Sequence, residues 1–222
     1  MASRTPRILV INPNSNEAVT EGIRAALAPA SFADGPLIAC HTLAEGPFGI
    51  ETQEDVESVV LPLQRLVCAR GDVDAFVIAC YSDPGLHAAR EITTKPVLGI
   101  AECGILTAMT LGQRFGVIAI AEASIRRHLR YLRQMGLSER LAGERALNIS
   151  VAESATGERT LEGMIAVGRR LRDDDGANVI IMGCAGMARH RAPLEAALGI
   201  PVVDPTQAAV AMAIGAVQFA RP

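Results

Sequence analysis

Two cysteines stand at equivalent places in the sequence, and a pair of thiols can move a proton. Cys80 directly follows the apolar run FVIA, and Cys184 directly follows the apolar run IIMG. Both thiols are therefore expected at the carboxyl ends of strands, where open α/β sheets collect their ligands. A reference pKa of about 8.5 allows a thiol to act as an acid or a base near neutral pH. The pair predicts an enzyme that removes a proton from one face of a carbon atom and returns a proton to the other face.

The alternative for each cysteine is a structural role, because cysteine is among the residues most often buried. An internal repeat favours the chemical interpretation. Cys80 and Cys184 lie 104 residues apart, Pro96 and Pro201 lie 105 apart, and the strands that open the two halves lie 107 apart. A near-constant offset at three positions indicates two equivalent halves. The remaining cysteines have no matched position and are interpreted as core or surface thiols: Cys40, Cys68 and Cys103.

The loops after the two cysteines could stabilise the charge that proton removal creates. Residues 81–83 and 185–187 lead towards predicted helices, so that their backbone N–H groups can hold a carboxylate or an enolate oxygen. A further loop, INPNSN over residues 11–16, joins a predicted strand to a helix capped by Ser15 or Asn16.

The elements that must position these loops alternate between strands and helices. Short apolar runs predict strands, and apolar residues at three- and four-residue intervals predict helices. The first half is predicted to contain strands Arg7–Ile11, Leu37–Thr42, Val73–Cys80 and Val97–Ala101 and helices Asn16–Ala28, Glu51–Arg70 and Pro84–Ile92. The second half is predicted to contain strands Phe115–Ile120, Leu147–Val151, Asn178–Gly183 and Pro201–Asp204 and helices Ser124–Met135, Thr160–Arg172, Pro193–Leu198 and Thr206–Phe219.

This alternation predicts an α/β fold of two pseudo-symmetric lobes, each a short, mostly parallel sheet flanked by helices. The active site is expected in the cleft between the lobes. The final helix is expected to cross back, so that residues 1–105 and 206–222 form the first lobe and residues 106–205 form the second.

Composition argues against several other classes of protein. Lys95 is the only lysine and lacks a surrounding GK[ST] motif, which argues against Schiff-base chemistry and a phosphate-binding loop. A net charge of −3 without a basic stripe, together with the absence of Trp, argues against nucleic-acid binding. The four histidines show no metal-binding spacing, so neither a metal nor another cofactor is expected. An acidic cluster, Asp173–Gly176, is interpreted as a solvated turn because it matches no calcium-binding loop.

The expected location is the cytoplasm. The first residues contain no apolar segment typical of a secretory signal, and no run approaches the ~18 apolar residues of a membrane span. Five widely separated cysteines without CxxC spacing are typical of a reduced compartment.

Several motifs together resemble one enzyme superfamily. They are INPNSN at 11–16, GPFGIET at 46–52, ACYSDPGLHAAR at 79–90, GIAE at 99–102 and GCAGM at 183–187. Across almost the whole chain the sequence resembles the aspartate/glutamate/hydantoin racemases, and within them it is most similar to the hydantoin and allantoin racemases. The resemblance implies a cofactor-independent racemase in which Cys80 and Cys184 are catalytic. It also implies that Asn14 and Ser15, with the backbones of Tyr81–Ser82 and Ala185–Gly186, hold the carbonyl or carboxylate of the substrate.

Comparison within the superfamily narrows the reaction. Arylmalonate decarboxylases keep only the second cysteine, whereas this chain has both, which favours proton exchange on two faces. Amino-acid racemases carry CNT and GCTH motifs where this chain has CYS and GCAG. Maleate isomerases also have two cysteines, but their surrounding motifs are not visible here. The chain departs from its relatives at residues 119–124, where Glu122 would disfavour an anionic intermediate unless it points away, and Ser124 could supply a hydroxyl.

We therefore expect a racemase of 5-substituted hydantoins or allantoin, whose C5 proton is acidic because it lies next to a carbonyl. Its partner is expected to be a small molecule, and the resemblance and the apolar last helix favour a homo-oligomer. The alternatives are a related cysteine-dependent decarboxylase or cis–trans isomerase of a small carboxylic acid, or a ligand-binding module without turnover. Four arginines of one predicted helix are expected to form an exposed face or a subunit contact: Arg126, Arg127, Arg130 and Arg133.

Overall fold

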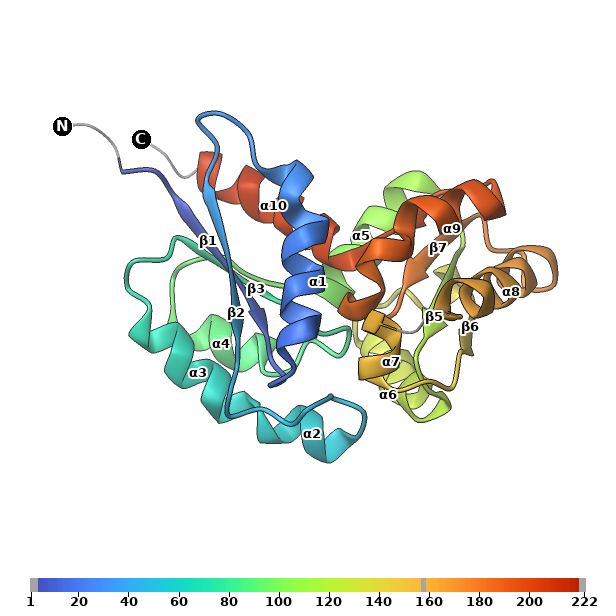
Figure 1. The fold of residues 1–222 in the computed structure, drawn as a ribbon, viewed down its shortest axis with the longest axis horizontal. Coiled ribbons are helices and arrows are strands. Elements are labelled where there is room, and N and C mark those ends of the chain that lie inside the picture. The colour runs from blue at the N-terminus through green and yellow to red at the C-terminus, as the bar shows by residue number, and fades with distance from the viewer. Residues whose placement is uncertain (1–3, 157–158, 220–222) are drawn as a thin grey trace.

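The chain forms two four-stranded parallel sheets in a computed structural model that describes residues 4–156 and 159–219 (Figure 1). The first sheet has the order β2-β1-β3-β4, with strands β1 (Arg7–Asn12), β2 (Leu37–Thr42), β3 (Ala75–Ile78) and β4 (Val97–Gly99). The second sheet has the order β6-β5-β7-β8, with strands β5 (Phe115–Ala119), β6 (Leu141–Ala146), β7 (Val179–Met182) and β8 (Val202–Val203). Every strand pair is parallel, and the two sheets share one strand order.

The predicted α/β class, with two sheets flanked by helices, is confirmed. Strands β3 and β7 are the third strand of each sheet, and every residue in both is buried. Their sequences, AFVI and VIIM, are apolar throughout because helices cover both faces of each sheet. The two cysteines follow these two strands, so the repeat in the sequence corresponds to a repeat in the structure.

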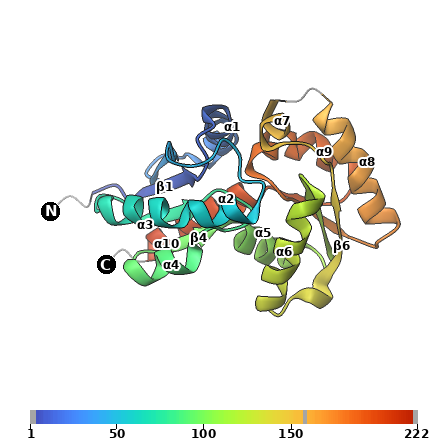
Figure 2. The same ribbon diagram turned by 90° about the horizontal axis from the view of Figure 1, so that it is seen from below.

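Helices surround both sheets (Figures 1 and 2). The first half contains α1 (Glu17–Leu27), α2 (Gln53–Ser58), α3 (Val60–Ala69), α4 (Leu86–Ile92) and α5 (Ile100–Leu111). The second half contains α6 (Glu122–Gln134), α7 (Val151–Thr156), α8 (Thr160–Asp173), α9 (Arg191–Leu198) and α10 (Pro205–Phe219). Helix α10 packs against α5, β3 and β1, and therefore returns to the first sheet.

The single helix predicted over Glu51–Arg70 is wrong, because the chain forms α2 and α3 with a break at Val59. Pro62 explains the break. In a continuous helix its ring would clash with the carbonyl of Ser58, and it has no N–H to bond that carbonyl. At the third position of α3 the missing N–H costs nothing, because the first turn of a helix has no partner for it.

The strand predicted at Leu147–Val151 is also wrong. The strand is β6, which ends at Ala146, and Val151 begins α7. Strand β6, with the sequence LAGERA, lies at the edge of the second sheet and carries two charged residues. Glu144 contacts His128, and Arg145 forms an ion pair with Asp175, so this strand lacks the apolar run that marks the central strands.

Helix α5 had no counterpart in the sequence prediction. The helix is apolar where it is exposed, at Leu106 and Leu111, as well as where it is buried. Its buried residues are Ile100, Ala101, Cys103, Gly104, Ile105 and Ala108. A helix that is apolar on all sides has no amphipathic period to recognise. It follows β4 directly and leads from the first sheet to the second (Figure 2).

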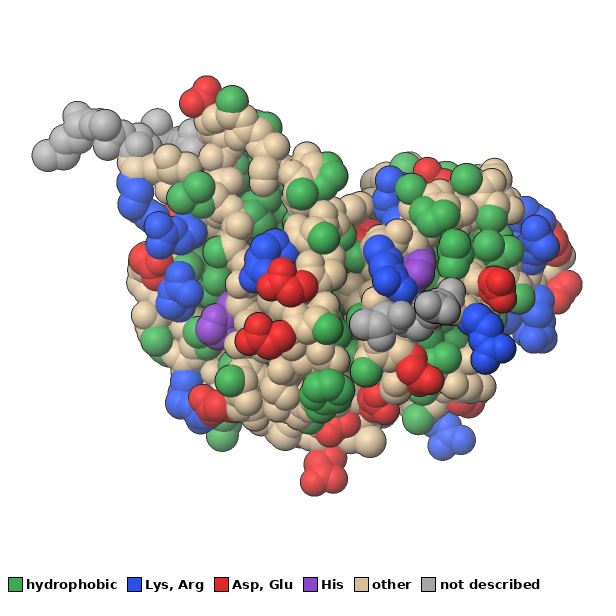
Figure 3. All heavy atoms as spheres, in the orientation of Figure 1, with side chains coloured by type: hydrophobic (Ala, Val, Ile, Leu, Met, Phe, Trp, Pro, Cys, Tyr) green, Lys and Arg blue, Asp and Glu red, His purple; other side chains and the backbone are tan. Residues whose placement is uncertain are grey.

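The surface carries charges of both signs. On the face drawn in Figure 3, acidic and basic side chains are scattered among apolar and polar ones. No helix within residues 4–156 and 159–219 is long and apolar enough to cross a membrane.

Candidate active site

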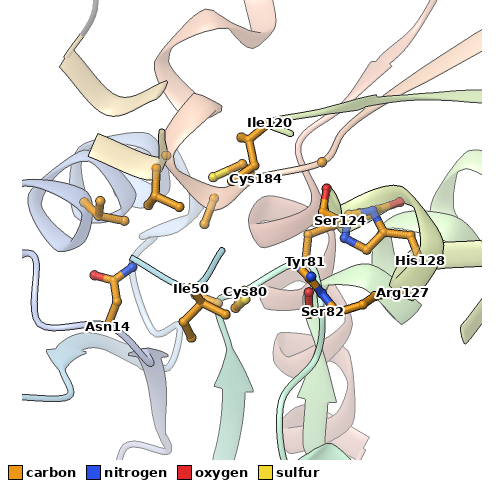
Figure 4. Close-up of a pocket in the computed structure, with 16 residues that line it drawn as sticks. Asn14, Ile50, Cys80, Tyr81, Ser82, Ile120, Ser124, Arg127, His128 and Cys184 are labelled. Atoms are coloured by element: carbon orange, nitrogen blue, oxygen red, sulfur yellow. The ribbon is translucent and has the colours of Figure 1, made fainter. Parts of the chain in front are cut away.

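Cys80 and Cys184 line one pocket, together with residues from both halves of the chain (Figure 4). The pocket is open to solvent on one side, and its empty space together with that opening amounts to about 430 Å³. Its apolar wall is formed by Val19, Ile50, Ala79, Ile120 and Val151. Its polar side chains are Asn14, Ser82, Ser124, Arg127 and His128. A small apolar pocket with two thiols and a few polar groups suits a neutral or weakly charged small molecule.

The loop after β3 fixes the position of Cys80. The Asp83 N–H donates to the Cys80 carbonyl at 2.9 Å, which closes a tight turn. The Asp83 carboxylate in turn accepts from the N–H groups of Ala101 and Glu102, both at 2.9 Å, at the start of α5. Gly99 is required here, because a Cβ at that position would lie 2.2 Å from the carboxyl carbon of Asp83. The loop after Cys80 is thus tied to the N-terminus of α5.

Burial makes both Cys80 and Asp83 weaker acids. It raises the pKa of the Cys80 thiol to about 12, with smaller effects from Cys184 and Asp83, while the Ser82 N–H and Arg127 lower it. Burial also raises the pKa of Asp83 to about 7, against the two N–H groups of α5 that stabilise the ionised form. Cys80 therefore rests as a thiol near neutral pH.

Cys184 follows β7 and has a different environment. Its side chain is 8% exposed, and its Sγ lies 3.5 Å from the Ser154 Oγ on α7. Burial raises the pKa of the Cys184 thiol, whereas hydrogen bonds from Ser154 and from the Gly186 backbone lower it. The Met187 N–H donates to the Cys184 carbonyl at 3.2 Å and closes the loop.

Asn14 presents its amide nitrogen to the pocket. Its Oδ1 accepts from the Asn12 Nδ2 at 2.9 Å and from the Asn16 N–H at 3.0 Å. With the oxygen occupied, the Nδ2 faces the side on which Cys80 lies (Figure 4). Asn16 caps α1 through its own Oδ1, so the INPNSN loop is held by a chain of asparagine hydrogen bonds.

The predicted site residues lie around this pocket with one exception. The residues that line it are Asn14, Cys80, Tyr81, Ser82, Ser124, Cys184, Ala185 and Gly186. Ser15 does not line it, and its N–H donates to the Pro47 carbonyl at 2.9 Å. The Ser124 hydroxyl donates to the Ala121 carbonyl at 2.7 Å. Glu122 is exposed and lies outside the pocket, so its charge does not oppose an anion there.

Arg127 corrects the sequence analysis, which placed it on an exposed face or a subunit contact. It lines the pocket, and its Nη2 donates to the Glu51 carbonyl at 3.0 Å. Its Nε is buried without a hydrogen-bond partner among the described residues. Burial lowers the pKa of the Arg127 guanidinium, and the neighbouring Cys80 opposes that shift. The site therefore contains a positive charge beside one of the thiols.

His128 is a second residue that the sequence analysis missed. Its Nδ1 lies 2.5 Å from the Glu144 Oε1, and its ring packs edge-on against Tyr81 with the centroids 5.0 Å apart. Because a carboxylate only accepts, Nδ1 is the donor. Ser124, Arg127 and His128 are spaced three and four residues apart on α6, and a polar stripe at that spacing was the available signal.

Hydrogen bonds beside the pocket join residues 51–53 of the first half to helices of the second half. The Glu51 carboxylate accepts from the Val151 N–H at 2.9 Å, and the Gln53 Oε1 accepts from Arg130 at 2.7 Å. Together with the Arg127 contact, these bonds join residues 51–53 to α6 and α7. Glu51 thereby contacts groups beside both thiols: Arg127, which lies next to Cys80, and α7, which lies next to Cys184.

Acidic residues of the 173–176 cluster form ion pairs with arginines. Asp175 pairs with Arg145 at 2.7 Å, and Asp173 pairs with Arg172. In the parts of the chain that the structure describes, no group of three or more His, Cys, Asp or Glu side chains could hold a metal ion.

Comparison with known proteins assigns the chain to a family. A sequence model of the family described as "Asp/Glu/Hydantoin racemase" matches residues 8–213. The chain belongs to this family. A hydantoin racemase of Pseudomonas sp. (strain NS671) is 37% identical over 211 residues, covering 93% of this chain and 84% of the relative.

Solved structures of the Asp/Glu/hydantoin racemase family agree with this assignment. An allantoin racemase from Klebsiella pneumoniae is 32% identical and has a TM-score of 0.89, covering 97% of this chain and 89% of its own. An allantoin racemase from Pseudomonas fluorescens is 28% identical and has a TM-score of 0.91, covering 96% and 91%. The predictions of the family and of an isomerase of the racemase type are confirmed.

Proposed function

We propose that this chain racemises a 5-substituted hydantoin or allantoin without a cofactor, with Cys80 and Cys184 as the acid–base pair. The observation that supports this most is that the two thiols follow equivalent strands and line one small pocket. The family, the similar hydantoin racemases and the solved structures of allantoin racemases support the substrate class.

The reaction needs one thiolate and one thiol at a time. The thiolate takes the C5 proton, and the C–H electron pair moves into the ring to form an enolate on the adjacent carbonyl oxygen. The opposite thiol then donates its proton to the other face of C5, and the electron pair returns. The product is the other enantiomer, and the two cysteines have exchanged protonation states. No electron acceptor is needed, because the ring carbonyl holds the charge.

Donors around the pocket would stabilise the enolate. The Asn14 Nδ2 is a neutral donor, and Arg127 adds a positive charge. The loop N–H groups of Ser82 and Gly186, which hydrogen-bond the two thiols, lie beside them. Donors aimed at developing charge in a largely apolar pocket act more strongly than they would in water. The Nε of Arg127 is buried without a hydrogen-bond partner among the described residues, so it is free to donate to the enolate.

Exchanging either cysteine tests the proposal. Cys80→Ser and Cys184→Ser should each lower the racemisation rate of a hydantoin by about 10²–10⁴-fold or more, as expected for loss of a general acid or base. Optical rotation measures racemisation, and deuterium incorporation at C5 in D₂O measures proton exchange. Cys68→Ser, which changes an exposed cysteine outside the pocket, should retain the wild-type rate.

The outcomes separate this function from its alternatives. Full activity in either single cysteine variant would refute the two-cysteine mechanism. Carbon dioxide release from a malonate would indicate a decarboxylase, and no exchange on any hydantoin or allantoin would indicate a binding module. Dialysis against a chelator should leave the rate unchanged, and a lost activity that metal restores would overturn cofactor independence.

A further inference from the structure

A buried serine outside the predicted site faces one of the two thiols. Ser154 lies on α7 with no exposed surface, and its Oγ is 3.5 Å from the Cys184 Sγ. The same hydroxyl donates to the Val151 carbonyl at 2.7 Å. We propose that Ser154 is a positioning residue that serves Cys184 in both of its protonation states. This inference rests on the proposed function, in which Cys184 is an acid in one direction and a base in the other.

A hydroxyl suits this task because it can both accept and donate. When Cys184 is a thiol, the S–H donates to the Ser154 oxygen while the O–H donates to the Val151 carbonyl. When Cys184 is a thiolate, rotation about the Cβ–Oγ bond turns the O–H towards the sulfur. One neutral group thus holds the sulfur in place before and after proton transfer, and no proton is gained or lost by the serine.

Cys80 has no comparable partner among the described residues. Its neighbours are the Ser82 N–H and the Arg127 guanidinium, which only donate or carry positive charge and so favour the thiolate alone. The two thiols are therefore supported in different ways, although the strands that carry them are equivalent.

The structure holds the Ser154 hydroxyl firmly in place. A Cβ on Gly186 would lie 2.5 Å from the Ser154 Oγ, so the loop after Cys184 has glycine where the serine approaches. The start of α7 is fixed by the Glu51 carboxylate, which accepts from the Val151 N–H at 2.9 Å. The bond between Glu51 and the start of α7 therefore also helps to position Ser154.

Ser154→Ala tests the inference in the free enzyme. Loss of a hydrogen bond to a thiolate should shift the ionisation of Cys184 upward by about one pH unit or more. Each unit lowers the thiolate fraction tenfold and raises nucleophilicity about threefold, so alkylation slows about three- to fourfold per unit. The measurement is iodoacetamide labelling at pH 8 and over a pH series, with each cysteine peptide followed by mass spectrometry.

Ser124→Ala is the matched control, because it also removes a buried hydroxyl from the pocket wall but one that bonds only the Ala121 carbonyl. It should leave the labelling profile of Cys184 unchanged, and exposed Cys68 provides an internal reference in every sample. Slower labelling of Cys184 in Ser154→Ala alone supports the inference. Equal profiles in wild type and Ser154→Ala would overturn it.

A second measurement does not depend on that variant folding. In the wild type, the infrared S–H stretch assigned by its loss in Cys184→Ala should show a hydrogen-bonded thiol, and a free-thiol frequency would overturn the inference. Both readouts are made without substrate. If both readouts give the expected result while no hydantoin or allantoin is racemised, the proposed function is wrong. If they do not give it while racemisation proceeds, only the role of Ser154 is wrong.

Discussion

Removing His128 should destabilise the protein strongly, because it leaves a buried carboxylate without its partner. The side chains of His128 and Glu144 are 8% and 3% exposed, and Nδ1 and Oε1 lie 2.5 Å apart. Breaking such a buried pair by deleting one member costs about 3–5 kcal/mol. For a chain of this length, about 2–4 °C of melting temperature is lost per kcal/mol, so His128→Ala should melt roughly 6–20 °C below the wild type.

The reverse deletion should cost less. Glu144→Ala leaves only the imidazole N–H unsatisfied, for which about 1–3 kcal/mol is expected. Because both residues belong to one interaction, the double variant should lose less than the sum of the two single losses. Urea unfolding followed by circular dichroism gives all three free energies of unfolding, and thermal melting gives the shift in temperature.

An exposed pair provides the control for this cycle. Arg170 and Asp174 lie 3.8 Å apart with side chains 62% and 60% exposed, and Asp174→Ala should cost less than about 1 kcal/mol. The reasoning is refuted if His128→Ala unfolds within 1 kcal/mol of the wild type, or if the two single losses simply add. Either result would mean that burial does not make this contact different from a surface pair.

Three further changes test other parts of the site. Glu51→Ala removes the carboxylate that accepts from the Val151 N–H. A hydrogen bond to a charged group contributes about 1.5–3 kcal/mol, so KM for a hydantoin should rise between about 10- and 150-fold in polarimetric assays. An unchanged KM would show that this bond between the two halves does not assist substrate binding. Gly186→Ala places a Cβ 2.5 Å from the Ser154 Oγ and should cost about 1–3 kcal/mol of stability together with activity, whereas wild-type melting and rate would contradict the close approach. Burial raises the pKa of Cys80 to about 12. The stability that the buried neutral thiol contributes is therefore fully present below the ordinary pKa of a thiol and is lost as the pH rises from there towards 12. The free energy of unfolding in urea should therefore fall less steeply with rising alkaline pH in Cys80→Ser than in the wild type. Equal slopes would argue that the thiol is not held in its protonated form.

The fold class and the centre of the site could be predicted because their signals are local. The runs before Cys80 and Cys184 are apolar at every position, and such a run with a following loop marks a central parallel strand wherever it occurs. The 104-residue offset then related the two halves without any knowledge of their contacts. The division into residues 1–105 with 206–222 and residues 106–205 stays a prediction, as does self-association.

The groups that surround the two thiols could not be predicted, because they are brought there by contacts between distant segments of the chain. Glu51 bonds Val151 across 100 positions of sequence, and Arg127 turns into the pocket because the Glu51 carbonyl accepts from it. On its own helix Arg127 looks like its exposed neighbours, since only the approach of the other half buries one face. Ser154 is likewise an ordinary helical serine until β7 brings Cys184 beside it.

The two thiols have different neighbouring groups, and in a racemase this difference can affect the kinetic constants in only one way. Enantiomers with one stereocentre have equal free energies, so the equilibrium constant is one and kcat/KM must be equal in the two directions. The different surroundings of Cys80 and Cys184 cannot favour either enantiomer in kcat/KM, and they can act only by raising or lowering kcat and KM together. We therefore expect the two enantiomers of a 5-substituted hydantoin to differ in kcat and in KM by one common factor. Initial rates for each pure enantiomer measure both constants, and a reproducible difference in kcat/KM would show that the reaction is not a simple racemisation at C5.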